Sequence, residues 1–267
     1  MAAHADFSGV IPPVVTPLTA DRELDRASLK RSIDRMIDRG VHGLFLLGSS
    51  SEVVFCTDSR RREIVETGIE AAAGRVPVLV GVIDAQTERM VEHARAAREL
   101  GADAVVATAP FYALGGPDEI EANFRAIREE VDLPLFAYDL PVCVHKKLDA
   151  DMLVGLGSEG VLAGVKDSSG DDVNFRFLVQ KNRAAGSPLK LFTGHEVVVD
   201  GAFLSGADGV VPGLGNVDPY GYVQQYKAYR EGDWDAVAQI QDRLALLMTI
   251  TSVTEGAVGF GAGVGAF

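Results

Sequence analysis

The chain has little cysteine, few aromatic residues and no long uninterrupted apolar run. Its two cysteines, Cys56 and Cys143, lie far apart without CxxC or metal-ligand spacing, which indicates a reducing compartment and no disulfide framework. No segment reaches the roughly 18 consecutive apolar residues of a membrane span. Residues 1–10 lack the basic region and apolar run of a signal peptide. We therefore expect a cytoplasmic protein with no membrane partner.

Positive charge is also scarce. The 25 lysines and arginines stand against 38 acidic residues, which leaves a formal net charge of -13 at pH 7. No cluster of Lys and Arg offsets this negative field, so nucleic acid and anionic membranes are poor partners and a small molecule is the more natural one. The chain is rich in small aliphatic residues: 47% of its 267 residues are hydrophobic, enough for the core of one large domain or two small ones.

Short β-rich runs recur eight times along the chain. We expect strands at 9–16, 43–47, 76–80, 104–107, 133–138, 161–166, 189–193 and 209–211. Amphipathic stretches at helical spacing lie between them, such as 29–39, 60–73, 89–100, 120–130 and 197–204. Strands that are apolar on both faces and are linked by helices suit a parallel sheet, and the count of eight favours a closed (β/α)8 TIM barrel.

No linker or low-complexity segment divides the chain. We expect a barrel core at 1–216 and a C-terminal helical segment at 217–267, packed on the barrel as one domain overall. Within that segment, residues 220–230 and 233–250 are expected to be helices. A glycine-rich end at 256–267 follows them.

Lys166 closes an apolar stretch and precedes a Gly/Ser loop, at the end of the sixth expected strand. An ammonium is costly to bury and loses its proton readily when desolvated, which makes such a lysine a nucleophile for a carbonyl carbon. Lys166 is therefore the first candidate catalyst, as a Schiff-base lysine. The alternative is a solvated lysine that merely begins the loop.

Other polar residues follow strand ends and would face the same cavity, because TIM-barrel active sites lie at the carboxyl face. Tyr138 ends the strand next to that of Lys166 and could shuttle the protons of imine formation, with Ser49 connecting it to Tyr112 or to solvent. The loop Gly48–Glu52 precedes a helix that begins near Thr57 or Asp58, so its amides and hydroxyls suit the carboxylate of a 2-keto acid. The alternative for this loop is a simple helix cap.

Together these motifs resemble the dihydrodipicolinate synthase and N-acetylneuraminate lyase family, the pyruvate-dependent class I aldolases. The resemblance spans nearly the whole chain. It rests on Gly9–Leu18, on the serine loop, on Tyr138–Pro141, where the family commonly has Tyr-Asn-x-Pro, and on Gly164–Asp171. The resemblance implies a homodimer or homotetramer, because Tyr112 matches a tyrosine that in many members enters the neighbouring subunit's site.

The resemblance also implies a role for each matching residue. Lys166 would form the imine with pyruvate, and Tyr138 would be the proton shuttle. Ser49 would relay protons and bind the carboxylate beside Ser50. Two further residues would line the pocket through backbone groups, Gly194 and Val211. No cofactor is implied, since the lysine imine is itself the electron sink.

The chain departs from the family pattern at several positions. Ser51 stands where the family usually has glycine, and Cys143 stands where dihydrodipicolinate synthases usually have an arginine for the carboxylate of aspartate semialdehyde. The cations that could replace this arginine are His145, Lys146 and Lys147. Polar residues of the lysine-feedback site of some synthases lack counterparts near Asp58 and Arg61, so we expect no such inhibition. Relatives also continue through further helices, so we expect a shortened C-terminal part here.

Because a buried carboxylate without its arginine is strongly disfavoured, we expect an aldolase or lyase that acts on a 2-keto acid and an aldehyde. A 2-keto-3-deoxy sugar acid is the favoured substrate. The first alternative is 4-hydroxy-tetrahydrodipicolinate (dihydrodipicolinate) synthase of lysine biosynthesis. A second is a non-catalytic protein that binds 2-keto acids.

Two other enzyme classes remain open from the residues alone. The glycine-rich Gly209–Asn216 could form the phosphate site that many barrels have after the eighth strand. A metal-dependent aldolase would need clustered ligands, and the histidines are dispersed, with His195-Glu196 as the pair that follows the end of an expected strand. The resemblance favours a site without metal.

Overall fold

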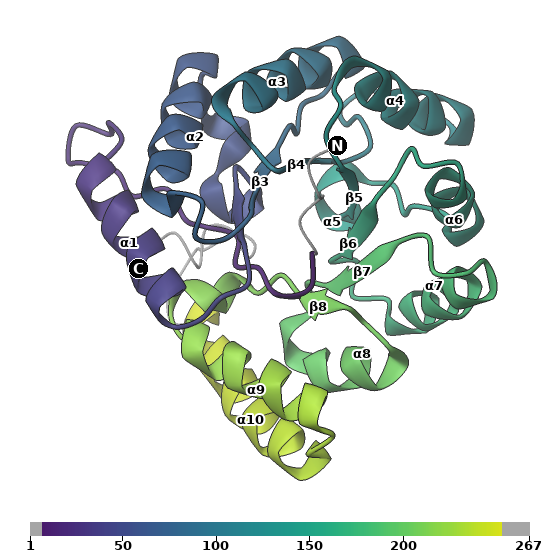
Figure 1. Cartoon of the computed structure of the whole chain (residues 1–267). Coiled ribbons are helices and arrows are strands. Elements are labelled where there is room, and N and C mark those ends of the chain that lie inside the picture. The colour runs from purple at the N-terminus through teal and green to yellow at the C-terminus, as the bar shows by residue number, and fades with distance from the viewer. Residues whose placement is uncertain (1–6, 253–267) are drawn as a thin grey trace.

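The structure, a computed structural model, describes residues 7–252. Eight parallel strands form one sheet in the order β1-β8-β7-β6-β5-β4-β3-β2. Their bounds are β1 Gly9–Val10, β2 Leu44–Leu46, β3 Val78–Gly81, β4 Ala104–Ala107, β5 Leu135–Asp139, β6 Gly164–Asp167, β7 Lys190–Thr193 and β8 Gly209–Val210. The strands curl into the predicted TIM barrel (Figure 1).

The barrel closes just beyond the short first strand. Pro13 pairs with Phe45 of β2 in a parallel bridge. The Phe45 N–H donates to the Pro12 carbonyl oxygen at 3.0 Å, and the Val14 N–H donates to the Phe45 carbonyl oxygen at 2.9 Å. Strand β1 is therefore shorter than the predicted 9–16, and two prolines without N–H groups explain why its ladder is interrupted.

Helices surround the strands (Figure 1). Those of the barrel are α1 Arg26–Asp38, α2 Asp58–Ala72, α3 Thr87–Leu100, α4 Pro117–Glu130, α5 Pro141–Val144, α6 Ala150–Ser158, α7 Asp172–Ala184 and α8 Val199–Ser205. The helices α1 to α4 begin two or three residues earlier than predicted, because their polar first turns lack the apolar pattern. The Asp25 side chain accepts from the Ser28 N–H and the Thr57 side chain accepts from the Arg60 N–H, so polar first turns belong to α1 and α2.

Aromatic rings fill the barrel beneath the carboxyl ends of its strands. The ring centroids of Phe136 and Phe192 lie 6.1 Å apart, and Phe7 packs edge-on against Phe136 at 5.2 Å. Gly164 provides the room for this layer, since a Cβ there would lie 2.4 Å from the Phe136 ring. The packed interior leaves the carboxyl ends as the place where polar side chains can gather.

Two antiparallel helices follow β8 and pack beside α8 (Figure 1). They are α9 Pro219–Glu231 and α10 Trp234–Leu247, close to the predicted helices, and a 3-10 helix over Met248–Ser252 ends the described part. The Gln225 amide of α9 donates to the Gln241 side chain of α10 at 2.8 Å. The glycine-rich 256–267 and the expected shortening lie outside the described residues. Within residues 7–252, no helix combines the length and apolarity that crossing a membrane requires.

Candidate active site

Lys166 and Tyr138 lie side by side at the carboxyl ends of β6 and β5. They are register partners in the sheet, so their side chains project from the same face. The Lys166 Nζ lies 4.0 Å from the centroid of the Tyr138 ring and 5.1 Å from that of Phe45, on β2. Lys166 is only 6% exposed, so the alternative of a solvated loop lysine is wrong. Phe45 was not predicted as part of the site, because the sequence marks it only as one apolar residue of a strand.

The serine loop brings a hydroxyl to the Tyr138 phenol. The Ser49 Oγ lies 3.4 Å from the Tyr138 hydroxyl oxygen, within reach for a proton relay. Ser49–Ser51 forms a short 3-10 turn in which the Ser51 N–H donates to the Gly48 carbonyl oxygen. The amides of Ser49 and Ser50 precede this first bond, which leaves them outside the hydrogen bonding of the turn.

Ser51, at the usual glycine position, anchors the loop. Its hydroxyl donates to the Val14 carbonyl oxygen, and the Thr16 hydroxyl donates to the Ser51 carbonyl oxygen at 3.0 Å. These contacts hold the serine loop against the chain segment that follows β1. The hydroxyl thus has a structural partner and does not obstruct Ser49.

Gly194 and Val211 lie at the ends of the next two strands. A Cβ on Gly194 would lie 2.0 Å from the Ser168 Oγ and 3.2 Å from the Lys166 Cε, so only glycine leaves room for the lysine. The Val211 N–H donates to the Thr193 carbonyl oxygen at 2.8 Å. That amide is thereby used, and the Val211 carbonyl oxygen is the backbone group that could accept from a ligand.

Tyr112 does not join the other predicted residues within one chain. Its side chain is 95% exposed, and its φ of 75° is unusual for a residue with a side chain. The relay from Tyr138 through Ser49 therefore does not continue to the Tyr112 of the same chain.

On the opposite face of β5 and β6, two buried carboxylates share one ammonium. Asp139 and Asp167 are register partners, and the Lys147 Nζ donates to both, at 3.1 Å for the Asp167 Oδ2. Burial raises the pKa of Asp139 to about 6, although the hydrogen bond from Lys147 opposes this shift. Burial acts to lower the pKa of Lys147, but the two carboxylates outweigh it and the net shift is upward.

Glu196, after β7, is a buried acid close enough to Lys166 for their charges to interact. From the sequence, it was considered only as a possible metal ligand. Its Oε1 accepts from the Tyr222 hydroxyl at 2.7 Å and from the Leu214 N–H at 2.9 Å. Burial raises the pKa of Glu196, opposed by these hydrogen bonds and by the charge of Lys166. Gln241 also donates to the Glu196 carbonyl oxygen at 2.9 Å, which connects α10 to the loop after β7.

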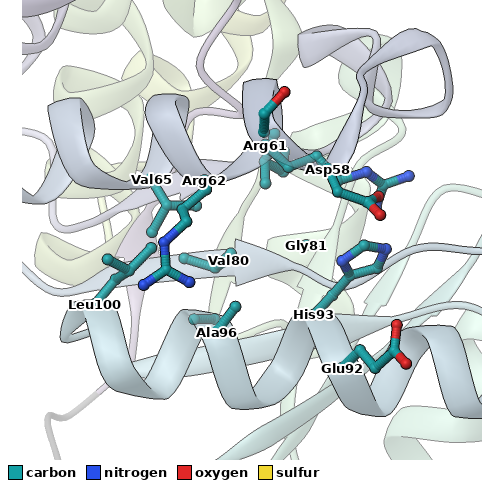
Figure 2. Close-up of a pocket in the computed structure, with 13 residues that line it drawn as sticks. Asp58, Arg61, Arg62, Val65, Val80, Gly81, Glu92, His93, Ala96 and Leu100 are labelled. Carbon is teal, nitrogen blue, oxygen red and sulfur yellow. The ribbon is translucent and has the colours of Figure 1, made fainter.

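A separate cavity of about 300 Å³ lies between α2 and α3, outside β3 (Figure 2). Its apolar floor includes Val80 and Leu100, and its charged rim includes Arg62 and Glu92. Asp58 and Arg61 are engaged by other parts of the protein. Arg89 pairs with Asp58 at 2.6 Å, and Arg61 donates to the Ile83 carbonyl oxygen at 2.8 Å. The cavity does not include Lys166 or Tyr138, and the expected absence of lysine inhibition stays a prediction.

The model of the dihydrodipicolinate synthetase family matches residues 6–260, nearly the whole chain. The chain belongs to this family. It is 32% identical over 241 residues to a 4-hydroxy-tetrahydrodipicolinate synthase of Phenylobacterium zucineum, covering 90% of this chain and 81% of the relative. It is 30% identical over 245 residues to the Escherichia coli K12 protein YjhH, named a probable 2-dehydro-3-deoxy-D-pentonate aldolase, covering 91% and 81%.

A solved family structure superposes closely on the chain. This is YagE of Escherichia coli K12, described as a prophage protein of the dihydrodipicolinic acid synthase family in complex with pyruvate. The TM-score is 0.90 at 28% identity, covering 94% of this chain and 84% of YagE. The family's members carry lyase and aldolase names, and the protein is an enzyme of this family.

Lys147 is not free to replace the synthase arginine. That side chain binds Asp139 and Asp167, so the expectation that it could serve a substrate carboxylate is wrong. Cys143 is exposed on the short helix α5, and partial burial of its thiol raises its pKa, which keeps it neutral. A neutral side chain therefore stands at the position of the synthase arginine.

The glycine-rich turn after β8 has structural uses. The Leu214 N–H is taken by Glu196, and the Gly215 N–H donates to the Pro212 carbonyl oxygen at 3.0 Å. A buried carboxylate beside these amides is unfavourable for a phosphate. Across residues 7–252, no group of three or more His, Cys, Asp or Glu side chains is arranged to hold a metal ion.

Proposed function

We propose that the protein is a Schiff-base aldolase or lyase whose Lys166 forms an imine with pyruvate or another small 2-keto acid. The observation that carries the proposal is the juxtaposition of the Lys166 amine, the Tyr138 ring and the Ser49 hydroxyl at the carboxyl end of the barrel. Membership of the family supports it. Pyruvate in the YagE complex supports the choice of a 2-keto acid.

The reaction begins with attack of the neutral Lys166 amine on the C2 ketone. The carbinolamine that results must lose water, and each step moves a proton. The Tyr138 hydroxyl would carry these protons, relayed by Ser49. The amides of Ser49 and Ser50 would bind the carboxylate, while Gly194 and the Val211 carbonyl line the space around the imine.

The imine then acts as an electron sink. In the cleavage direction, the bond between C3 and C4 breaks, its electrons pass into the enamine, and the C4 hydroxyl loses its proton as the aldehyde leaves. Protonation of the enamine at C3 and hydrolysis return pyruvate and the free lysine. The condensation runs through the same steps in reverse and needs no cofactor.

For the second substrate we favour a 2-keto-3-deoxy sugar acid, or the aldehyde that its cleavage yields. The neutral Cys143 at the synthase arginine position supports an aldehyde without a carboxylate, because an unpaired buried carboxylate is costly. The name of the YjhH relative agrees with this choice. The name of the Phenylobacterium relative supports the alternative, a 4-hydroxy-tetrahydrodipicolinate synthase that condenses pyruvate with aspartate semialdehyde.

We also propose that the enzyme works as a homodimer or homotetramer in which Tyr112 serves a neighbouring site. Tyr112 is exposed, and Phe55 and Leu114 expose apolar surface as well. Analytical ultracentrifugation would measure the assembly. Loss of activity in Tyr112→Phe without loss of the oligomer would support a role for its hydroxyl, whereas a fully active monomer would contradict it.

Intact mass after incubation with pyruvate and borohydride tests the central proposal. Reduction traps the imine, so wild type should gain one pyruvate adduct and Lys166→Ala none. Lys181→Ala is the matched control, because Lys181 pairs with Asp151 on the surface and should not matter. Absence of an adduct on wild type, or an adduct that survives Lys166→Ala, would contradict the proposal. An adduct without turnover of any aldehyde or sugar acid would favour the 2-keto-acid-binding alternative.

A further inference from the structure

We propose that Lys147 is a positioning residue for this reaction: its ammonium, held between Asp139 and Asp167 on the outer face of β5 and β6, fixes the strand ends that place Tyr138 beside Lys166. The proposal rests on the proposed function for its activity readout only. Its stability readout is independent of any reaction. We call the group of Lys147, Asp139 and Asp167 the carboxylate clamp.

The alternation of side chains along a strand connects the clamp to the site. Tyr138 and Lys166 are register partners on one face, and each is followed directly by its aspartate on the other face. A shift of either strand end would therefore move an aspartate and a site residue together. Both aspartates are buried, and the clamp joins the strands at the last paired residues before the loops.

The remaining oxygen atoms of the clamp bind the two loops. The Leu148 N–H donates to the Asp139 Oδ1 at 3.1 Å. The Ser169 N–H and hydroxyl donate to the Asp167 Oδ1 at 2.8 and 2.6 Å. The chain on both sides of the site is thus held by the same two carboxylates, including the segment that follows α5, the helix that carries Cys143.

Removal of the ammonium would leave two buried like charges on adjacent strands. Other charged groups around the clamp do not replace it. Lys166 lies on the opposite face of the sheet. Asp171 is a further acidic residue nearby, and the charge of Lys147 lowers its pKa. On the outer side, a cavity of about 350 Å³ carries Asp149, Asp151 and Lys181. That lysine is already paired with Asp151.

Loss of Lys147 therefore has a pH-dependent consequence. Loss of Lys147 removes the contacts that lower the pKa of Asp139, so that pKa would rise further. At alkaline pH, above the raised pKa, both carboxylates would be charged and would repel each other, which drives the strand ends apart. At acid pH one carboxyl takes up a proton and can donate a hydrogen bond to the other, which restores a contact between them. The raised pKa of Asp139, already about 6 with Lys147 present, makes it the group that protonates first.

The test compares Lys147→Met with the double variant Lys147→Met/Asp139→Asn, which removes both the cation and one carboxylate charge. Borohydride trapping with pyruvate gives the rate of imine formation over roughly pH 5 to pH 8. We expect Lys147→Met to be slower by about 10-fold to 100-fold at the alkaline end of this range, because small displacements of reacting groups have effects of this size. The deficit should shrink toward acid pH, and the double variant should recover most of the rate.

A merely structural role would give a different pattern. A deficit that is equal at every pH and persists in the double variant would overturn the proposal, as would a wild-type rate in Lys147→Met. If Lys147→Met fails to fold, Lys147→Arg and the double variant still test it, because both should fold and trap pyruvate near the wild-type rate.

The thermal midpoint separates this proposal from the proposed function. If wild type traps no pyruvate, Lys147→Met should still unfold at lower temperature than wild type at about pH 8, where both carboxylates would be charged. The gap should narrow toward acid pH and in the double variant. A gap that neither acid nor Asp139→Asn reduces would contradict the clamp, whatever the enzyme's substrate.

Discussion

The two faces of strands β5 and β6 hold two lysines in opposite environments. On the inner face, Lys166 lies between the rings of Tyr138 and Phe45, and it forms no ion pair with any described residue. On the outer face, Lys147 lies between two carboxylates. Lys166 is 6% exposed, whereas the Lys147 side chain is 31% exposed.

In the proposed mechanism, this difference in partners separates the lysine that reacts from the lysine that holds the strands. An ammonium between two carboxylates keeps its proton and is useless as a nucleophile. Lys166 lies instead against two aromatic rings, and none of the ion pairs among the described residues includes it. The chain places these two lysines on opposite faces of one sheet, with the proposed nucleophile on one side and the proposed positioning residue on the other.

The largest effect is expected from Tyr138→Phe, which removes the phenolic hydroxyl on the inner face but keeps the packing of the ring. The phenylalanine ring should still contact Lys166, whereas the proton carrier is lost. Turnover should fall by about 10²-fold to 10⁴-fold, the usual range for a general acid or base. Pyruvate should still be trapped by borohydride, more slowly. Unchanged turnover with each active substrate would show that another group carries the proton.

Gly194→Ala would disturb the inner face through sterics. The new Cβ would meet the Ser168 Oγ and approach the Lys166 Cε at 3.2 Å, so the lysine must move. We expect a decrease of roughly 10-fold in the trapping rate, together with a stability cost of about 1 to 3 kcal/mol from overpacking. Gly201→Ala is the control, since nothing lies within 4 Å of a Cβ there. Equal trapping rates for the two variants would contradict the close approach.

Ser49→Ala tests the relay with a smaller expected effect. The distance of 3.4 Å between the Ser49 Oγ and the Tyr138 hydroxyl is at the long end for a hydrogen bond, so the contribution is modest. We expect turnover to fall by less than about 10-fold, with Tyr138 still able to exchange protons with water. In the double variant with Tyr138→Phe, the serine change should have no further effect. An additive loss would mean that Ser49 acts independently.

Asp139→Asn changes the outer face alone. It should barely change activity, because Lys147 still pairs with Asp167. Stability should change with pH. The folded-state pKa of Asp139 is about 6, above the roughly 3.9 of an unfolded chain, so the folded state binds the proton more tightly. In wild type, proton binding by Asp139 stabilises the folded state below about pH 4, and this stabilisation is lost as pH rises toward about 6.

Urea denaturation of wild type and Asp139→Asn at several pH values measures this contribution. Relative to the variant, wild type should lose roughly 1 to 3 kcal/mol of unfolding free energy between about pH 4 and pH 6. Glu196 titrates in the same direction in both proteins, and it therefore cancels in the difference. Parallel pH profiles would show that Asp139 is not the group that holds the proton.

Much of the fold could be predicted from the sequence, because the strands of a parallel barrel are continuous apolar runs. Strand β4 has the predicted bounds Ala104–Ala107. The helix α7, Asp172–Ala184, was not among the predicted ranges, and its mixture of Asp, Asn, Gln and Lys explains why its apolar face is hard to recognise. Helix starts were missed where polar capping residues precede the apolar pattern.

The local motifs of the site were recoverable, whereas its long-range partners were not. The structure brings Lys166, Tyr138 and Ser49 together as their strand-end positions predicted. The partners of Lys147 lie 8 and 20 residues away in sequence, so it was interpreted as a free cation beside the loop. Phe45 was missed for the same reason, and Glu196 was considered only as a possible metal ligand, since only the closed barrel brings these two residues near Lys166.

The hydrogen bonds of Glu196 and Gln241 have a consequence for how the molecule unfolds. Gln241 of α10 binds the Glu196 backbone and the Gln225 side chain of α9, while the Glu196 carboxyl binds Tyr222 of α9 and the Leu214 amide. Fraying of the last two helices would therefore release the loops after β7 and β8. Amide hydrogen exchange should show α9, α10 and these loops opening as one cooperative unit. The loop after β7, which carries Glu196 near Lys166, would belong to that unit.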